Sequence, residues 1–434
     1  MIWTGRIRAG AWAGLAVACV LSGALVGCKD RAGMNQTAAT GAAPAPTWTG
    51  DVASLIARRC GGCHGGGGDP ALAPPALGSY EDARRAAGAM LLAVRRRTMP
   101  PFGADDTGLC GTWLDAPWLT DAEIATVGAW VEHGAPQGAP SAIRDSPDAP
   151  PRFEADRDHL VTVEAGVPFT PELGERAYRC FVVEPRLPKA TAITGLTVSS
   201  EPAAAVRQAA LYELGNGAAL RRSQQLDAAD PGPGWSCYGA PDVAGAGVKL
   251  LASWSHNTPV QRLPAGTGVP LARETPLVLQ LRYDLIASAP GIPVRARMLL
   301  ATGDVVRPAH FVALRPAPFA LAPAQTQARV RASWTADRAT TLWGLVPRMH
   351  TLGRVLDLER TRAGGDRQCL AHFGHWDVYD QQLFRGAAPV ALLPGDRVTL
   401  TCEFTTTSRQ TEIEMGEAPD DEQCLAHLYL VDLP

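Results

Sequence analysis

The chain has 434 residues, of which 46% are hydrophobic and 19% charged, and its formal net charge is −3. A prior of about 150 residues per domain predicts two or three domains. The weak negative charge, and the lack of a Lys/Arg run with interleaved aromatic residues outside the terminal region, argue against nucleic-acid binding. The 44 glycines and 36 prolines favour turns and short strands over long surface helices.

The N-terminus predicts a bacterial lipoprotein signal peptide. Arg6 and Arg8 precede an apolar run over residues 11–25, which is shorter than the ~20 residues that a membrane-spanning helix needs. The run ends in Leu-Val-Gly-Cys, and we expect Cys28 to be the diacylated first residue of the mature chain. The lipid would anchor the protein in the bacterial cell envelope, facing the periplasm or on the outer membrane.

The sequence Cys60-Gly61-Gly62-Cys63-His64 predicts covalent attachment of haem c. Two thiols separated by two residues can each bond one vinyl group of the porphyrin, and the adjacent imidazole then becomes the proximal iron ligand. A zinc half-site would need a second ligand pair at similar spacing. A redox dithiol would give no reason for His64.

Three helical segments are expected around this site. Residues 51–59 carry apolar side chains at helical spacing up to Cys60. Two later segments begin with the capping pattern Ser/Thr-x-x-Asp/Glu. These starts are Ser79 with Asp82 and Thr120 with Glu123. Three short helices suffice for a small domain because the haem supplies much of its apolar core.

Met99 is the expected sixth ligand of the iron. Pro100 and Pro101 bar helix continuation behind it and fix an extended loop. Met90 is the competing thioether, but it lies on the apolar stripe of a helix. Ligation by His and Met is common in c-type electron carriers and leaves no site for oxygen. With the Met-Pro-Pro segment and the ending Trp-x-x-x-Gly-Ala-Pro, residues 49–138 resemble a class I cytochrome c domain.

The chain changes character after a Pro- and Ala-rich linker. Apolar residues then alternate with a period of two, as over residues 277–284 and 398–404, which predicts half-buried strands. Short strands separated by Gly and Pro favour antiparallel sandwiches over βαβ units. A Pro-rich stretch at 315–323 divides this part into two sandwiches.

Six local patterns of the β-rich part occur in the order and spacing of the copper type II, ascorbate-dependent monooxygenases. They are Tyr178-Arg179-Cys180-Phe181, Trp235-Ser236-Cys237-Tyr238, Leu263-Pro264-Ala265-Gly266-Thr267-Gly268, Met349-His350-Thr351-Leu352-Gly353, His375-Trp376-Asp377 and Glu422-Gln423-Cys424-Leu425. Residues 154–434 therefore resemble this family, which includes peptidylglycine hydroxylating and dopamine β-monooxygenases. The resemblance implies two jelly-roll-like domains.

The resemblance also implies where copper would bind. The family holds one copper with an adjacent His pair and a third His, and the other with a His-x-His pair and a Met. Here these positions read Arg207-Gln208, Arg282, Arg348-Met349-His350 and Gln423. His350 alone retains the family's residue type, and a protonated guanidinium cannot donate a lone pair to a metal. Copper binding at these positions is therefore disfavoured.

Two other kinds of binding site stay open: a rearranged copper site and a site for a small anion. Three further histidines could form a rearranged copper site, although surface or hydrogen-bonded core roles are the commoner alternative. They are His372, His375 and His427. Arg207 and Arg282, expected on neighbouring strands, could bind a small anionic ligand such as a carboxylate. The simpler alternative is solvated charge, or an ion pair of Arg282 with Asp284 or Glu213.

Six of the ten cysteines remain after Cys19 leaves with the signal, Cys28 takes lipid and Cys60 and Cys63 take haem. An even remainder in an exported protein predicts disulfides. The family order implies the pairs Cys180 with Cys237 and Cys402 with Cys424. Cys110 and Cys369 are left over, and they could pair and join the haem domain to the second sandwich, or stay apart.

The predicted fold is a small helical cytochrome c domain followed by two antiparallel jelly-roll-like sandwiches. The expected segments are a signal peptide at 1–27, a flexible tether at 28–48, a cytochrome c domain at 49–138, a linker at 139–153, and β-sandwiches at 154–314 and 315–434. This domain organisation favours a lipid-anchored haem electron carrier that has a periplasmic or membrane redox partner. The β module of the carrier would dock a partner or bind a ligand. The alternatives are a copper monooxygenase fed with electrons by the haem, and a redox-responsive binding protein.

Overall fold

The computed structural model describes residues 44–433 with internal gaps. The gaps are residues 66–73, 106, 115, 140–152, 154, 156–158, 172–177, 186, 203–204, 238–242, 244–247, 257, 259, 284–290, 306, 417 and 419. The expected signal peptide and Cys28 lie outside the described residues. Within those residues, no helix is long and apolar enough to cross a membrane.

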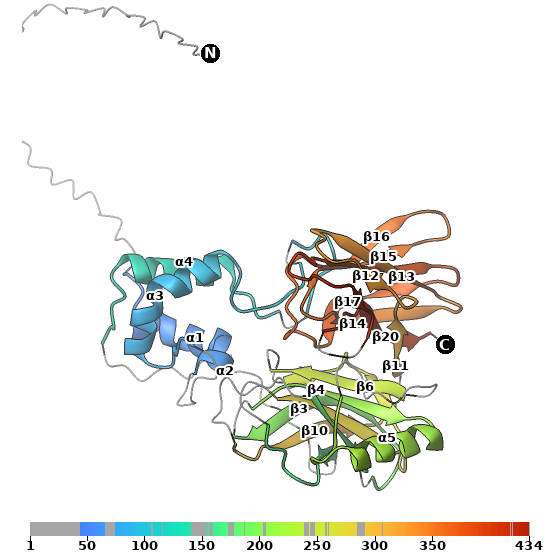
Figure 1. Ribbon diagram of the computed structural model, residues 1–434. Coiled ribbons are helices and arrows are strands. Elements are labelled where there is room, and N and C mark those ends of the chain that lie inside the picture. The colour runs from blue at the N-terminus through green and yellow to red at the C-terminus, as the bar shows by residue number, and fades with distance from the viewer. Residues whose placement is uncertain are drawn as a thin grey trace, which may run out of the picture. The chain divides into compact units, whose positions relative to one another are not determined.

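The helical part consists of a π-helical turn and four α-helices in the described residues. These are Trp48–Val52, α1 (Ala53–Arg59), α2 (Gly61–His64), α3 (Tyr80–Arg95) and α4 (Asp121–Glu132) (Figure 1). Ser79 accepts a hydrogen bond from the Asp82 N–H at the start of α3, and Thr120 and Glu123 form a reciprocal capping box on α4. Both predicted helix starts are confirmed.

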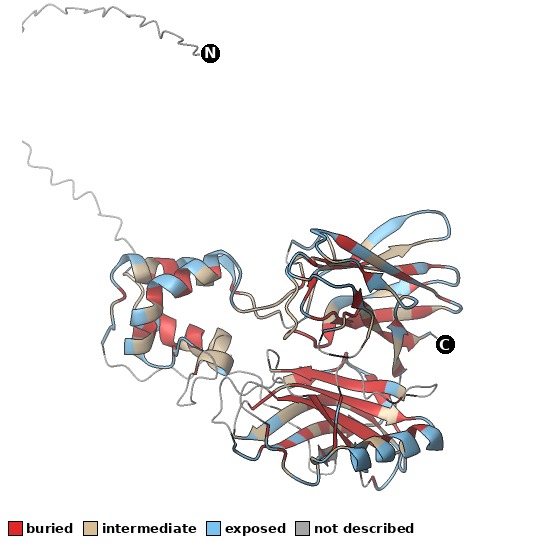
Figure 2. Ribbon diagram, viewed as in Figure 1, coloured by how far each residue is buried: buried red, intermediate tan, exposed pale blue. Residues whose placement is uncertain are grey.

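The first sandwich contains ten strands and one helix in the described residues. They are β1 (Leu160–Glu164), β2 (Tyr178–Val183), β3 (Thr191–Glu201), β4 (Val206–Leu214), α5 (Gly217–Ala229), β5 (Trp235–Ser236), β6 (Val248–Ser255), β7 (Val260–Arg262), β8 (Thr267–Leu271), β9 (Leu277–Tyr283) and β10 (Arg295–Gly303). One sheet has the order β5-β2-β9-β4-β6, and the other contains β1-β10-β3-β8, with β7 paired to β3. Side chains from both sheets, such as Leu211 and Leu279 from one and Ile193 and Met298 from the other, share one buried core (Figure 2).

The second sandwich follows the same plan. Its strands are β11 (Arg307–Leu314), β12 (Ala320–Leu321), β13 (Ala328–Thr335), β14 (Thr340–Arg348), β15 (Gly353–Thr361), β16 (Arg367–Phe373), β17 (Phe384–Leu392), β18 (Arg397–Phe404), β19 (Ile413–Glu414) and β20 (Leu425–Asp432). The main sheets have the orders β11-β20-β14-β17 and β13-β18-β15-β16. A short parallel pairing of β8 with β11 continues one sheet from the first sandwich into the second. The predicted fold class, helical and then antiparallel β, is confirmed.

The described residues contain three disulfides. Cys180 is bonded to Cys237 and Cys402 to Cys424, the pairs that the family resemblance implies. The third joins Cys110, between α3 and α4, to Cys369 on β16, across 259 residues of sequence. The pairing that the sequence left open is therefore formed, and it links the helical part to the second sandwich.

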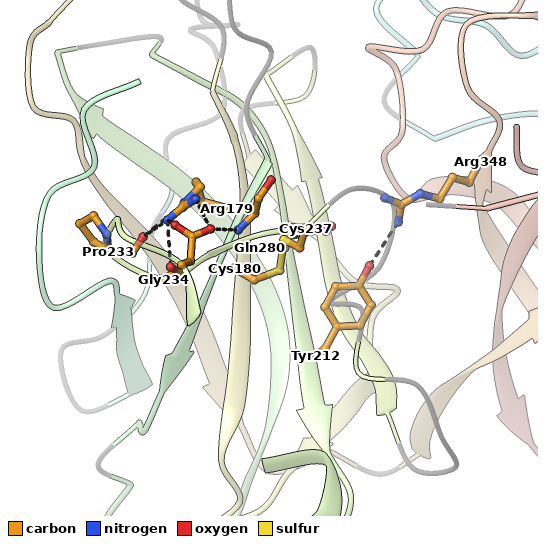
Figure 3. Close-up of a disulfide and its surroundings, with 10 residues drawn as sticks. Arg179, Cys180, Tyr212, Pro233, Gly234, Cys237, Gln280 and Arg348 are labelled. Carbon is orange, nitrogen blue, oxygen red and sulfur yellow. Dashed lines mark hydrogen bonds and ion pairs between the residues drawn. A yellow bond between two sulfur atoms is a disulfide. The ribbon is translucent and has the colours of Figure 1, made fainter. Parts of the chain in front are cut away.

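An ion pair between Arg179 and Asp230 lies beside the Cys180–Cys237 disulfide in the first sandwich (Figure 3). Arg179 donates from two guanidinium nitrogens to the Asp230 carboxylate, each at 2.9 Å, and also to the carbonyl oxygens of Pro233 and Gly234. Partial burial alone would raise the pKa of Asp230, but hydrogen bonds, first from Arg179, outweigh burial and lower the pKa to about 2. The bidentate pair fixes the chain after α5 against β2.

We expect Asp230→Asn to destabilise the protein by about 2 kcal/mol at pH 7, because it leaves the Arg179 guanidinium buried without its counter-charge. Since the folded-state pKa of Asp230 lies below its ordinary value, this stabilisation is complete above about pH 4 and is lost as the pH falls towards 2. Denaturant unfolding at pH 7 and pH 3 measures both effects. Asp304→Asn, in an exposed pair with Lys189, is the control and should cost less than about 1 kcal/mol. Equal losses in the two variants would contradict this account.

Candidate functional site

The two cysteines of the attachment sequence lie at the junction of α1 and α2. Cys60 is the C-cap of α1, and Cys63 lies within α2. Neither forms a disulfide. Burial raises the pKa of Cys60 to about 12 and also raises the pKa of Cys63. A redox dithiol has a lowered thiol pKa, so the local electrostatics disfavour that alternative.

His64 is oriented as a metal ligand. Its Nδ1 lies 2.8 Å from the carbonyl oxygen of Pro75. Because a carbonyl only accepts hydrogen bonds, Nδ1 carries the hydrogen and Nε2 keeps its lone pair for a metal. The N–H of Leu77 donates to the His64 carbonyl at 2.8 Å, which fixes the same segment a second time. Two unoxidised thiols beside an oriented imidazole fit the covalent attachment of haem.

The two candidate methionines have different surroundings. Met90 is 7% exposed and packs in the helical core with residues such as Leu91, Val127 and Trp130. Met99 lies beyond the end of α3, and 42% of it is exposed. The core role of Met90 agrees with its position on the apolar stripe of a helix, while a thioether outside the core is accessible to an iron.

The segment after Met99 is fastened to the second sandwich. The N–H of Gly103 donates to an Asp380 carboxylate oxygen at 3.1 Å, and the N–H of Asp105 donates to the His372 carbonyl at 2.8 Å. The Cys110–Cys369 disulfide follows. Aromatic rings also pack across this contact: Phe102 against Phe384, and Trp113 against both Phe373 and Phe384. The sandwich therefore holds the loop that carries Met99.

Two of the three copper positions of the first sandwich, Gln208 and Arg282, belong to a buried hydrogen-bond network, whereas Arg207 is only partly buried. Gln208 on β4 lies opposite Arg282 on β9. Arg282 is 1% exposed, and its Nη1 donates to the Gln208 side-chain oxygen and to the Val378 carbonyl, both at 3.1 Å. Tyr178 donates to the same Gln208 oxygen at 2.9 Å. The guanidinium carbon also lies 4.3 Å from the centre of the Tyr379 ring.

These contacts correct one expectation. Solvated charge was the simpler alternative for Arg282, but its guanidinium is buried. Among the described residues no carboxylate forms an ion pair with it, and Glu213 faces Leu277 in the strand register. Asp284 lies outside those residues. The predicted proximity of the strands bearing Arg207 and Arg282 is confirmed by the pairing of β4 with β9.

The copper positions of the second sandwich are also buried. Arg348 is 9% exposed, and its Nη1 donates to the Tyr212 hydroxyl of the first sandwich at 3.2 Å (Figure 3). His350 is 2% exposed, and its Nδ1 faces the Asp421 carbonyl at 2.8 Å. Burial, assisted by the charge of Arg348, lowers the pKa of His350 to about 4. The imidazole is therefore neutral at pH 7. Gln423, at the position of the family's Met, is 5% exposed.

The other three histidines lie in separate environments. His372 is half-exposed, with Nδ1 2.6 Å from Asp357, and His375 is exposed. Burial, followed by the charge of Arg348, lowers the pKa of His427 to about 3. In the part of the chain that the structure describes, no three His, Cys, Asp or Glu side chains are grouped so that they could hold a metal ion.

A buried acid holds the turn that contains His350. Glu422 is fully buried, and its carboxylate accepts hydrogen bonds from the N–H groups of Leu352 (2.6 Å), His350 (2.9 Å) and Gln423 (3.2 Å). Burial outweighs these bonds and raises the pKa of Glu422 to about 7. The sequence marked Glu422 only as part of a family pattern, because no local signal shows that it bonds to a turn 70 residues earlier.

Three of the six stretches that resembled the monooxygenases, at residues 349–353, 375–377 and 422–425, lie within a match to a known family. Residues 51–135 match the cytochrome c family, and residues 321–432 match the copper type II ascorbate-dependent monooxygenase C-terminal domain. The chain therefore joins a cytochrome c domain, which is a haem redox domain, to a copper-monooxygenase-like module.

Comparisons with curated proteins and with solved structures give no further information on function. No curated protein matches the chain. Among solved structures, the infectious bursal disease virus VP2 subviral particle is 12% identical, with 64% of this chain and 70% of that chain covered and a TM-score of 0.20. PNGF-II is 8% identical, with 64% and 66% covered and a TM-score of 0.26. Neither likeness bears on function.

We expect Glu422→Gln to reduce the pH dependence of stability between about pH 4.5 and 7. Since the folded-state pKa of Glu422 is above its ordinary value, its contribution is complete below about pH 4.5 and is lost as the pH rises through 7. The shift corresponds to a difference of about 3 kcal/mol across this interval. Denaturant unfolding of both proteins at several pH values gives the difference curve, in which the histidine contributions cancel. A flat difference curve would contradict the raised pKa.

Proposed function

We propose that this chain is an exported, lipid-anchored electron carrier whose haem c is its redox centre, and whose monooxygenase-like module no longer performs copper catalysis. The observation that carries the proposal is the buried Arg282 guanidinium, which stands where the family has a copper-binding histidine and is bonded into the protein by Gln208 and Val378. A permanent cation at a metal-ligand position repels a metal ion and offers it no lone pair.

The cytochrome c domain supplies the residues for the haem. Cys60 and Cys63 would form the two thioether bonds, and His64 would present Nε2 to the iron, with its ring held by the Pro75 carbonyl. Met99 would provide the sixth ligand from the exposed loop after α3. When bound, the haem supplies a one-electron iron couple. His64 and Met99 would hold the iron between them and would leave no place for oxygen to bind.

The monooxygenase-like module would support this ligation of the iron. Its Asp380 side chain and Cys369 fasten the segment that follows Met99. It also offers surfaces for docking a periplasmic or membrane redox partner, or for binding a small anionic ligand. The lipoprotein signal sequence that ends in Leu-Val-Gly-Cys28 supports export and anchoring in the cell envelope.

Copper-dependent hydroxylation has weaker support. It requires neutral donors at two sites, and His350 is the single family-type ligand left among the six positions. The positive charges of Arg348 and Arg282 act on the His350 ring, and they would also repel a metal cation there.

We expect Met99→Leu to leave the haem iron without its sixth ligand, since leucine has a similar volume to methionine but no thioether. The reduced unmodified protein should not bind carbon monoxide, whereas the variant should bind it. The reduction potential of the variant should fall by on the order of 0.1 V, within the roughly 0.8 V range that axial ligands control. Visible spectra and a redox titration of the full-length protein measure these changes.

Met90→Leu is the matched control, because Met90 is a core residue of the same helical domain. It should leave carbon monoxide exclusion and the potential unchanged. The electron-carrier proposal fails if the unmodified reduced protein binds carbon monoxide. The Met99 assignment fails if both leucine variants behave alike.

A further inference from the structure

A small cavity lies where the two sandwiches meet. Its volume is about 20 Å³, and residues of both sandwiches line it, among them Arg282, Arg348, Gln208, Gln381 and His427. Its lining contains two guanidinium groups and no Asp or Glu among the described residues. Three of the six positions that match copper ligands of the family, Gln208, Arg282 and Arg348, thus line one positively charged cavity.

The charge in this cavity is desolvated. Arg282 is 1% exposed and Arg348 is 9% exposed. The Nη1 of Arg282 is bonded, but its buried Nε has no hydrogen-bond partner among the described residues. The buried Nδ1 of His427, on the same cavity, likewise lacks one in the described ranges. Burying a guanidinium without a counter-charge is costly, and polar contacts from Gln208 and Val378 offset only part of that cost.

A small anion would satisfy this arrangement. It would supply the negative charge that the cavity lining lacks, and it could accept a hydrogen bond from the unpartnered Arg282 N–H. The cavity holds roughly one water-sized group, so a phosphate or an organic carboxylate exceeds the space. Chloride is the abundant anion that combines one negative charge with the required size.

We propose that the cavity between Arg282 and Arg348 binds one chloride-sized inorganic anion that fastens the two sandwiches together. The inference rests on the proposed function, because copper at the same positions would need the guanidinium groups to withdraw. The site would then bind an anion where the family resemblance implies metal cations. The anion would attract both Arg282 on β9 of the first sandwich and Arg348 on β14 of the second. This attraction would add to the existing contact of Arg348 with Tyr212.

The first experiment measures stability against chloride. The full-length, haem-loaded protein is unfolded by heat and by denaturant in sodium chloride, with sodium gluconate holding the ionic strength constant. The gluconate anion is too large for the cavity. Above the dissociation constant, each tenfold rise in chloride should raise the folding equilibrium constant about tenfold. Equal stability in chloride and gluconate at all concentrations would overturn the proposal.

A matched pair of variants assigns the effect to the cavity. Arg282→Met should abolish the chloride dependence, because the guanidinium is lost while a chain of similar length remains. Arg295→Met, at an exposed position on β10, should retain it. Retention of the full dependence in Arg282→Met would overturn the proposal.

Crystals of the unmodified protein grown in sodium bromide test the site even if Arg282→Met fails to fold. We expect an anomalous peak within roughly 3.5 Å of the Arg282 side chain. Water or no density in the cavity overturns the inference. Copper content measured on the same preparation separates the two proposals: an empty cavity without copper contradicts the anion alone, whereas bound copper contradicts the electron-carrier function as well.

Discussion

The burial of the Arg282 guanidinium is the constraint on which the relation between the two sandwiches depends. The side chain leaves β9 of the first sandwich and bonds to the Val378 carbonyl of the second, while Tyr379 packs against its face. Gln208 accepts a hydrogen bond from Arg282 and donates one to the Val378 carbonyl, so the network spans the junction between the two sandwiches. Removal of either hydrogen bond of Arg282 would leave this buried charge more poorly compensated, which is costly. The junction is therefore held in one arrangement.

Under the proposed function, the same junction explains how the two sandwiches hold together without copper. A neutral imidazole replaced by a smaller side chain would leave a void, and a void costs packing energy. Arg282 and Gln208 are long enough to reach the Val378 carbonyl of the second sandwich, and Arg348 reaches the Tyr212 hydroxyl of the first. Direct hydrogen bonds therefore connect the two sandwiches at this junction.

Local patterns in the sequence predicted the elements well. The caps at Ser79 and Thr120 and the alternation over 398–404 depend on neighbouring residues, so they are visible without a tertiary structure. The half-buried strand predicted over 277–284 is wrong: β9 is buried along its whole length, because the face that carries Arg282 contacts the second sandwich. The Cys110–Cys369 bond remained open because its partners are 259 residues apart and lie in different parts of the fold. The burial of Arg282 was missed for a similar reason, since its partner Val378 is 96 residues away and has no sequence signal.

Metal analysis of the mature protein tests the central claim most directly. The protein is exported by cells grown with ample copper, purified without chelators, and assayed for iron and copper per chain. Arginine at three of the six ligand positions predicts about one iron per chain, all of it haem, and copper near zero. Copper near one per chain, retained after gel filtration, would contradict the account and restore the monooxygenase as the leading function.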